Sequence, residues 1–507
     1  MKPTPTQRPA GREPLQAGQR RSLVGNTLWN LAGTFLPLLV GLAVIPPLLH
    51  ALGIERFGLL SLIWMLTGYL GLLDLGLGRA LTKLVAEAAG HARRDHLPRA
   101  VWTGLGLMSG FGAIGALALA LAAEPLARRL LNIPAPLQAE AVGAIGFLAV
   151  SIPVAIATTG LRGVMEGLHL FRLANLIRVP LAALTFLAPL AVAVVTPDLA
   201  LVSASLLGVR LVGLAAHWIA CLWALPALAQ PRRPDRALFR LLLGFGGWLT
   251  VTNVVGPLMT YLDRFVIGAL FDLAAVAYYT TPYELVTKLL LVPFALTAVL
   301  FPTFSRALAQ RSEASAPLMV RSIAAVFVVI LPIVMFGVAY AREGLGLWLG
   351  EEFASHSFRV GQWLAAGVLM NSMAQIPFTF VQGAGRPDWI AKLHLLELPF
   401  YFLALWWALD VAGIVGAAIA WTVRVSVDAV ALLWMAHVVA PSGIRFPRRL
   451  GFAVALACAA LVCVALIEST LVRGLIVLGA TGASAMLLWG LSFGSEPLES
   501  AAARSGG

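Results

Sequence analysis

The chain has 507 residues, of which 60% are hydrophobic and 12% are charged, and its formal net charge is +12. Soluble domains contain about 25% charged residues, so this composition indicates a polytopic membrane protein and excludes a second, large soluble domain. The basic residues lie in short segments beside apolar runs, where they set orientation and contact anionic lipid, so we expect no nucleic-acid partner.

Residues 1–20 are polar and are predicted to form a disordered cytoplasmic tail. Fourteen apolar segments of membrane-spanning length follow, and because unpaired backbone groups are not tolerated in lipid, the predicted fold is all-helical. The predicted spans are 25–49, 57–77, 101–123, 139–160, 173–195, 199–224, 240–262, 275–302, 318–340, 360–381, 389–409, 412–438, 450–467 and 472–492. The segment 341–359, with Glu343, Glu351, Glu352 and His356, is then the longest outer loop.

The distribution of basic residues predicts the orientation. With the N-terminus placed in the cytoplasm, 26 of the 36 Lys and Arg residues fall on the cytoplasmic side and 7 fall on the other side. Positively charged loops stay in the cytoplasm, so we expect both termini inside the cytoplasmic membrane and an even number of spans.

A weak internal repeat suggests how the spans are grouped. Phe57-Gly58-Leu59 aligns with Val276-Ala277-Tyr278, and Arg210 and Arg424 occupy similar positions in spans six and twelve. The predicted organisation is a tail at 1–20, an N-lobe of six helices at 21–230, a C-lobe of six helices at 231–440, two further helices at 441–493, and a tail at 494–507.

Several short motifs occur in order along the chain. Asn26 and Asn30 lie in the first span, and Leu52-Gly53-Ile54-Glu55-Arg56-Phe57-Gly58 and Leu73-Asp74-Leu75-Gly76-Leu77-Gly78-Arg79-Ala80 follow. In the second half come Tyr261-Leu262-Asp263-Arg264-Phe265-Val266-Ile267-Gly268 and Val276-Ala277-Tyr278-Tyr279. Over residues 22–440 this pattern resembles the bacterial polysaccharide or O-antigen flippases, in the superfamily of the multidrug and toxin extrusion (MATE) transporters and the lipid II flippases. Ala277 departs from it, because the family usually has Gly there.

The resemblance implies a MATE-like fold and a flippase for lipid-linked oligosaccharide. The substrate would be a polyprenyl-pyrophosphate-linked repeat unit for O-antigen, capsule or exopolysaccharide, carried across the membrane by alternating access. Partners would include membrane lipids and also a polysaccharide polymerase and chain-length machinery. No catalytic residue and no cofactor are expected.

Charged residues inside spans are costly and are therefore candidates for function. Three cations lie in mid-span: Arg210, Lys288 and Arg424. Lys288 has Glu284 at i−4 and Arg424 has Asp428 at i+4, so each pair either neutralises itself or serves the substrate or a coupling ion. Arg210 has no acid nearby in the sequence, and an Arg fork suits phosphate.

The remaining candidates are weaker. Asp263 and Arg264 point about 100° apart on a helix, so that one anchors the turn and the other faces the cavity. Glu284 and Asp263 are the candidate carboxylates for coupling transport to a proton or sodium gradient. Asp74 is either a solvated helix end or an inner gate. Asn371 and Gln375 share a face of span ten and either bind sugar hydroxyls or join helices, and Asn30 completes the predicted substrate set. Glu397 has His394 at i−3, which we interpret as a satisfied polar pair.

Other functions make different demands on the sequence. Cys221, Cys458 and Cys463 lie in spans and the eight His residues are scattered, so neither a disulfide framework nor a metal site is predicted. A cation-coupled drug or metabolite antiporter of the same fold would be expected to carry an acidic site in the first lobe, where span one has no carboxylate. A membrane glycan polymerase or ligase would usually have a larger outer loop.

Overall fold

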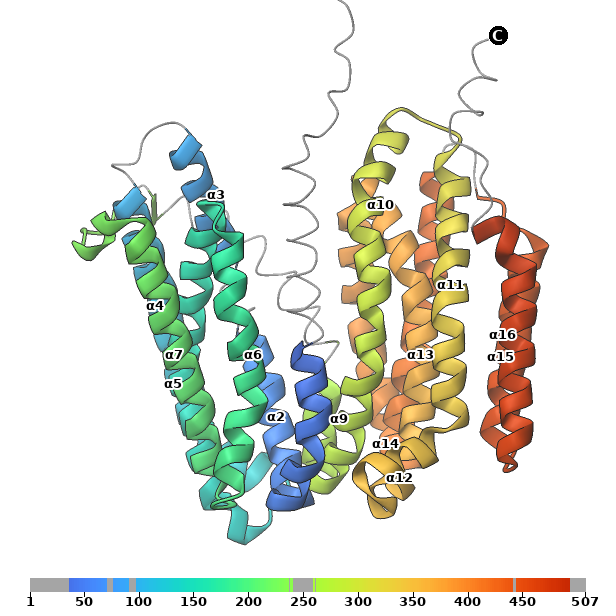
Figure 1. Cartoon of the computed structure of the whole chain (residues 1–507), viewed down its shortest axis with the longest axis horizontal. Coiled ribbons are helices and arrows are strands. Elements are labelled where there is room, and N and C mark those ends of the chain that lie inside the picture. The colour runs from blue at the N-terminus through green and yellow to red at the C-terminus, as the bar shows by residue number, and fades with distance from the viewer. Residues whose placement is uncertain are drawn as a thin grey trace, which may run out of the picture. The chain divides into compact units, whose positions relative to one another are not determined.

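The structure, a computed structural model, describes residues 36–70, 76–90, 97–236, 238–239, 259, 261–440 and 444–492. Within these ranges the secondary structure is helical, without strands, and ten helices are long and apolar enough to cross a membrane (Figure 1). The all-helical, multi-pass prediction is confirmed. The count of fourteen spans stays a prediction, because most of the seventh span falls outside these ranges.

The chain forms two compact units, and neither is a continuous stretch of sequence. The first comprises Met1–Leu48, Asp74–Ala118 and Phe147–Gly246, and the second comprises Leu49–Leu73, Leu119–Gly146 and Gly247–Gly507. The predicted division into two six-helix lobes and a C-terminal pair stays a prediction.

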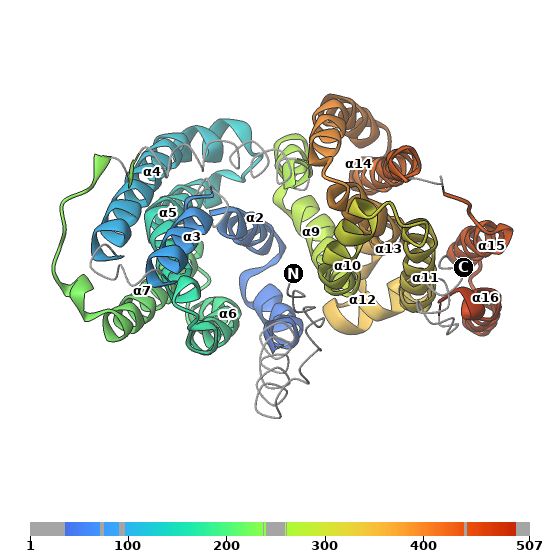
Figure 2. The ribbon, with the colours of Figure 1, turned by 90° about the horizontal axis from the view of Figure 1, so that it is seen from above.

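Five long or medium helices carry most of the first unit. They are α3 (Leu77–Gly90), the first part of α4 (Leu97–Pro125), the last part of α5 (Gln138–Gly167), α6 (Phe171–Ala193) and α7 (Leu199–Ala224), preceded by the helix Leu36–Leu52. Helix α7 begins where an Asp198 carboxylate oxygen accepts hydrogen bonds from the backbone N–H groups of Ala200 and Leu201, at 2.8 and 3.3 Å. α6 and α7 lie side by side (Figure 2).

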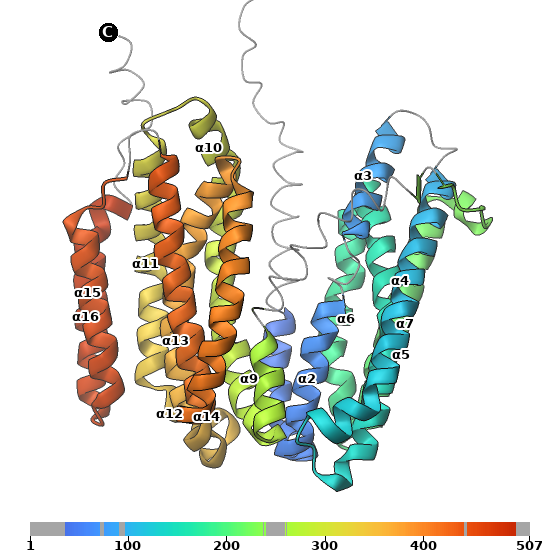
Figure 3. The ribbon, with the colours of Figure 1, turned by 180° about the vertical axis from the view of Figure 1, so that it is seen from behind.

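The second unit contains most of the other helices. In chain order they are α2 (Ile54–Leu70), α9 (Leu273–Thr287), α10 (Leu291–Ala309), α11 (Ser315–Ala339), α12 (Ala341–Leu349), α13 (Glu351–Gly383), α14 (Pro387–Val439), α15 (Arg448–Leu466) and α16 (Thr470–Ser492). α15 and α16 pack on each other and on α11, which packs on α13 (Figures 2 and 3). Residues 261–270 are also helical.

The structure corrects two segments that were predicted to be loops. The segment between predicted spans two and three contains α3, whose Leu81 and Val85 are fully buried against α4 and α5. The predicted outer loop 341–359 is instead α12 followed by the start of α13, with Gly350 between them at φ +92°. Hydropathy averaged over a span-length window does not reveal these helices, because their charged residues lower the average.

The glycine motifs have a packing explanation. A Cβ atom on Gly58 of α2 would stand 1.8 Å from the carbonyl oxygen of Leu273, so only glycine permits this contact with the start of α9. Gly163 of α5 meets the carbonyl oxygen of Gly78 of α3 in the same way, at 2.8 Å. Two of the predicted motifs therefore mark places where helix backbones approach closely.

Helix α14 is a hairpin of two helical arms. Its backbone turns at Ala412 and Gly413, where Gly413 has φ +57° and ψ −144°, so the arms are residues 387–411 and 414–439. A Cβ atom on Gly416 would meet the carbonyl oxygen of Ala408 at 1.8 Å, which shows how closely the arms approach beside the turn. The arms correspond to predicted spans eleven and twelve.

Candidate functional site

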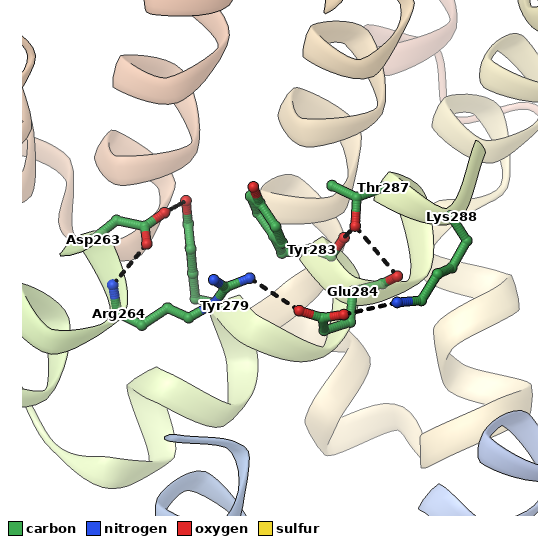
Figure 4. A network of polar contacts seen from close by, with 7 residues as sticks. All are labelled: Asp263, Arg264, Tyr279, Tyr283, Glu284, Thr287 and Lys288. Carbon is green, nitrogen blue, oxygen red and sulfur yellow. Dashed lines mark hydrogen bonds and ion pairs between the residues drawn. The ribbon is translucent and has the colours of Figure 1, made fainter. Parts of the chain in front are cut away.

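A network of charged and phenolic side chains joins helical residues 261–270 to α9 (Figure 4). Asp263 is 1% exposed, and its carboxylate accepts hydrogen bonds from the Tyr279 hydroxyl at 2.6 Å and from the backbone N–H of Arg264 at 2.8 Å. With both carboxylate oxygens engaged inside the protein, Asp263 anchors the two helices to each other.

Arg264 is a fully buried cation, with 0% of its surface exposed. Its Nη2 donates to Glu284 Oε1 at 3.3 Å, and its guanidinium lies over the rings of Tyr283 and Tyr261, 4.1 and 5.0 Å from their centres. Ion pairing and cation–π contacts with aromatic faces offset the cost of burying a guanidinium. The sequence predicts that one of Asp263 and Arg264 anchors the turn and that the other faces the cavity, whereas in the structure both side chains are buried and belong to one network.

Glu284 lies between two cations. Its Oε2 accepts from Lys288 Nζ at 3.0 Å, which confirms the predicted i, i+4 pair, and its Oε1 accepts from Arg264. The side chains of Glu284 and Lys288 are 43% and 45% exposed, whereas that of Arg264 is buried. The network therefore runs from a buried end at Asp263 to an exposed end at Lys288.

The helix changes geometry at Lys288. Residues Lys288–Leu290 form a 3-10 turn, η5, between α9 and α10. The Thr287 hydroxyl donates to the carbonyl oxygen of Tyr283 at 2.7 Å, and Pro293 has no N–H to donate to the carbonyl oxygen of Leu289. Both features disturb regular α-helical hydrogen bonding, and a 3-10 stretch within a long helix is typical of a hinge. Lys288 is the first residue of this break.

A second cluster of ionisable side chains connects the two arms of α14. Arg424 Nε lies 3.7 Å from Glu397 Oε2, and His394 Nε2 lies 3.5 Å from Asp428 Oδ1. The Arg424 guanidinium lies 5.6 Å from the centre of the Tyr401 ring. Arg424 thus pairs with Glu397 on the opposite arm and not with Asp428 at i+4. His394 lies against Asp428, so the predicted satisfied pair of Glu397 with His394 is wrong.

The position of the turn sets Glu397 level with Asp428 and Tyr401 level with Arg424, so each ion pair joins residues about one helical turn apart in level. Glu397 precedes Ala412 by fifteen residues and Asp428 follows Gly413 by fifteen, while Tyr401 and Arg424 are each eleven residues away. In an antiparallel hairpin of helices with equal rise per residue, such positions lie at the same level. Residues at equal distances on either side of a short turn could therefore have been recognised in the sequence as neighbours. The i, i+3 and i, i+4 spacing along a single helix does not reveal them.

The other predicted site residues are dispersed. Arg210 of α7 belongs to the first unit, where Nη1 donates to the carbonyl oxygen of Ser151 at 3.4 Å. Gln375 Nε2 donates to Asn371 Oδ1 at 3.1 Å, so these two amides bind each other on α13. Asn30 and Asp74 lie outside the described residues.

Sequence reasoning also missed the ion pair between Arg56 and Glu140. Arg56, in the first glycine motif, donates through Nε and Nη2 to the two carboxylate oxygens of Glu140, at 2.8 and 2.7 Å. This two-point contact fixes the start of α5 to α2. The tyrosines at 279 and 283 were also missed as site residues, although their i, i+4 spacing places them on one face of α9.

The chain is similar in sequence to proteins of polysaccharide biosynthesis. Residues 23–308 match the profile of a family described as polysaccharide biosynthesis protein. Over 417 residues the chain is 28% identical to a Shigella flexneri protein assigned as an O-antigen transporter, which covers 82% of this chain and 97% of that protein.

Two solved structures show the same fold. The lipid II flippase MurJ, in an inward closed conformation, matches with a TM-score of 0.68 and 13% identity, over 92% of this chain and 99% of that one. An inward-facing multidrug resistance MATE family transporter of the MOP superfamily matches with a TM-score of 0.65 and 16% identity, over 82% and 94%. The predicted MATE-like fold is thus confirmed.

Proposed function

Since the chain belongs to the polysaccharide biosynthesis protein family, which matches more than half of its length, we propose that it is a flippase for polyprenyl-pyrophosphate-linked oligosaccharide. The transported molecule would be a repeat unit of a surface polysaccharide, such as O-antigen, capsule or exopolysaccharide. Transport proceeds by alternating access. The likeness to a Shigella O-antigen transporter over most of both chains supports this substrate class.

The half-exposed Lys288, at a break within a membrane-spanning helix, is the observation that carries the proposal. An ammonium group facing hydrocarbon is costly, so the exposed part of Lys288 and Glu284 faces water or a polar ligand. A pyrophosphate and its sugars need such a path, because they do not cross hydrocarbon unaided, whereas the polyprenyl tail remains in lipid.

The network assigns different tasks to its two cations. Lys288 has three N–H donors, one of which points to Glu284, so its ammonium group is available to a phosphate oxygen. Arg264 is buried and held by Glu284 and two aromatic rings, so it positions Glu284 and contributes positive charge from within the protein. Arg210 is the candidate cation of the first unit, and Arg424 that of the α14 hairpin.

The wider assignment is part of the same proposal. The protein lies in the cytoplasmic membrane with both termini inside, as the charge distribution favours, and it has no catalytic activity. Its two six-helix lobes act with a trailing pair of helices. Membrane lipids surround it, and a polysaccharide polymerase with its chain-length machinery receives the product.

Genetic complementation tests the proposal. A flippase-deletion strain that carries this chain should regain surface polysaccharide, detected by gel staining of the extracted glycan. Lys288→Ala and Arg210→Ala should reduce that signal while the amount of protein in the membrane is unchanged. Lys392→Ala is the matched control, because Lys392 is 76% exposed and pairs only with a surface carboxylate in the described part of the chain.

The outcomes separate the competing functions. Normal export by both Lys288→Ala and Arg210→Ala would refute the role of these cations. Failure to restore polysaccharide, together with cation-dependent drug resistance in the same strain, would identify a drug antiporter of this fold instead.

A further inference from the structure

Two carboxylates on opposite arms of α14 are buried close together with one imidazole. The ligand atoms of His394, Glu397 and Asp428 all lie within 4.8 Å of one another. The side chains of Glu397 and Asp428 are each 10% exposed, so both acids are removed from water. Placing two like charges this close in a buried site is unfavourable unless something positive compensates them.

Hydrogen bonds do not provide that compensation. Neither carboxylate oxygen of Glu397 has a hydrogen-bond partner among the described residues, and Asp428 Oδ1 has none there either. The nearest cation, Arg424, has its Nε 3.7 Å from Glu397, beyond hydrogen-bonding distance. Buried polar groups in proteins are normally satisfied, so carboxylate oxygens that have an ion pair at 3.7 Å but no hydrogen bond leave room for a further positive partner.

Charge counting indicates the size of that partner. Two carboxylates and one guanidinium sum to a formal charge of minus one, so one added positive charge makes this set of groups neutral. A divalent ion would leave the cluster with a net positive charge, and the nearby Arg424 guanidinium would repel it. Two nearby carboxylates share a proton readily, and chains of Asp, Glu and His residues carry protons in membrane transporters.

Charged and aromatic side chains from three helical segments surround Glu397. The charged groups that act on it are Asp428, Arg424 and His394. Tyr401 lies one helical turn after Glu397 on the same arm. It interacts electrostatically with Asp263 and Arg264 of helical residues 261–270 and with Tyr283 of α9. From α13, the ring of Phe378 stacks at 6.4 Å on His394, without adding charge.

We propose that Glu397, Asp428 and His394 form a buried site that binds one exchangeable proton. On uptake, a proton passes from water to a carboxylate oxygen and an O–H bond forms. On release that bond breaks and the carboxylate is restored. His394 is the entry point, because its side chain is 23% exposed and its Nε2 lies next to Asp428. Its ionisable residues differ from those of the Lys288 network, which adjoins the site at Tyr401, and its proton binding does not depend on which molecule is transported.

Infrared difference spectroscopy on the purified full-length protein, without any glycan, tests this site directly. Acidification from neutral to mildly acid pH should produce the carbonyl band of a protonated carboxyl group in an apolar environment. Glu397→Gln should abolish this band. Glu351→Gln is the matched control and should retain it, because Glu351 is an exposed partner of Arg342.

Two further variants predict opposite shifts in the midpoint of this titration. Asp428→Asn removes a negative neighbour, so Glu397 should take up its proton only at a lower pH. Arg424→Gln removes a positive neighbour, so uptake should begin at a higher pH. Each shift is measured in the variant itself, so the proposal remains testable even if Glu397→Gln fails to fold.

Three results would overturn the proposal. The first is the absence of the band from the wild-type protein, and the second is its persistence in Glu397→Gln. The third is stoichiometric binding of radioactive sodium by the wild type but not by Glu397→Gln, which would make the cluster a metal site. These measurements involve no transport. A negative result therefore refutes the proton site without bearing on the proposed flippase function, and failed complementation does not refute the proton site.

Discussion

Glu284→Gln gives a quantitative test of the network around Arg264. The substitution keeps the shape of the side chain but removes the negative charge that faces a fully buried guanidinium. At 3.3 Å and an effective dielectric constant of about 20, two unit charges attract each other by about 5 kcal/mol. Water reaches Glu284, which is 43% exposed, so we expect a loss of about 2 kcal/mol of unfolding free energy, between the values for surface pairs and buried pairs.

The assay is denaturant unfolding of the purified protein in mixed micelles, followed by tryptophan fluorescence. Glu351→Gln is again the control, since its ion pair with Arg342 is exposed and should contribute less than about 1 kcal/mol. The double variant Arg264→Met/Glu284→Gln should be more stable than the sum of the two single losses predicts, because the buried charge is gone. Equal losses for Glu284→Gln and Glu351→Gln, or strict additivity in the double variant, would refute the reasoning.

Two other predictions concern helix packing. Gly58→Ala should lower the unfolding free energy by about 1–3 kcal/mol, because its Cβ would meet the carbonyl oxygen of Leu273. Gly110→Ala, at a helical glycine with open space around it, should be neutral or slightly stabilising in the same titration, and equal losses at both sites would contradict the close approach. Glu140→Gln should cost about 1 kcal/mol by removing the two-point contact from Arg56, and protease cleavage near the start of α5 should become faster; unchanged stability and cleavage would argue against that contact as an anchor.

The candidate site could be predicted in part. Lys288 and Glu284 are four residues apart on one helix, so their pairing follows from helix geometry and was correct. The partner of Arg424 was not predictable in this way, because Glu397 is 27 residues away and meets it only when α14 folds back at Ala412 and Gly413. Arg264 was identified as a candidate, but its burial between Glu284 and two aromatic rings depends on how α9 packs.

The motifs divide in the same way. Gly58 was conspicuous in the sequence as part of a family pattern, but its physical role, a backbone contact with Leu273, appears only when α2 and α9 are packed together. The burial of α3 and the helical start of α13 were likewise invisible to hydropathy averaging.

By itself, the amino-acid sequence determined that this protein is a multi-pass helical membrane protein, and it indicated most of the spans. It did so because apolar length and the hydrogen-bonding needs of a backbone in lipid are local properties. Tertiary structure decided the partners of the charges that pair across helices or across the arms of α14. Ion pairs such as Arg424–Glu397 and Arg264–Glu284 form between helices, and their energies depend on distances and burial that only the packed chain defines.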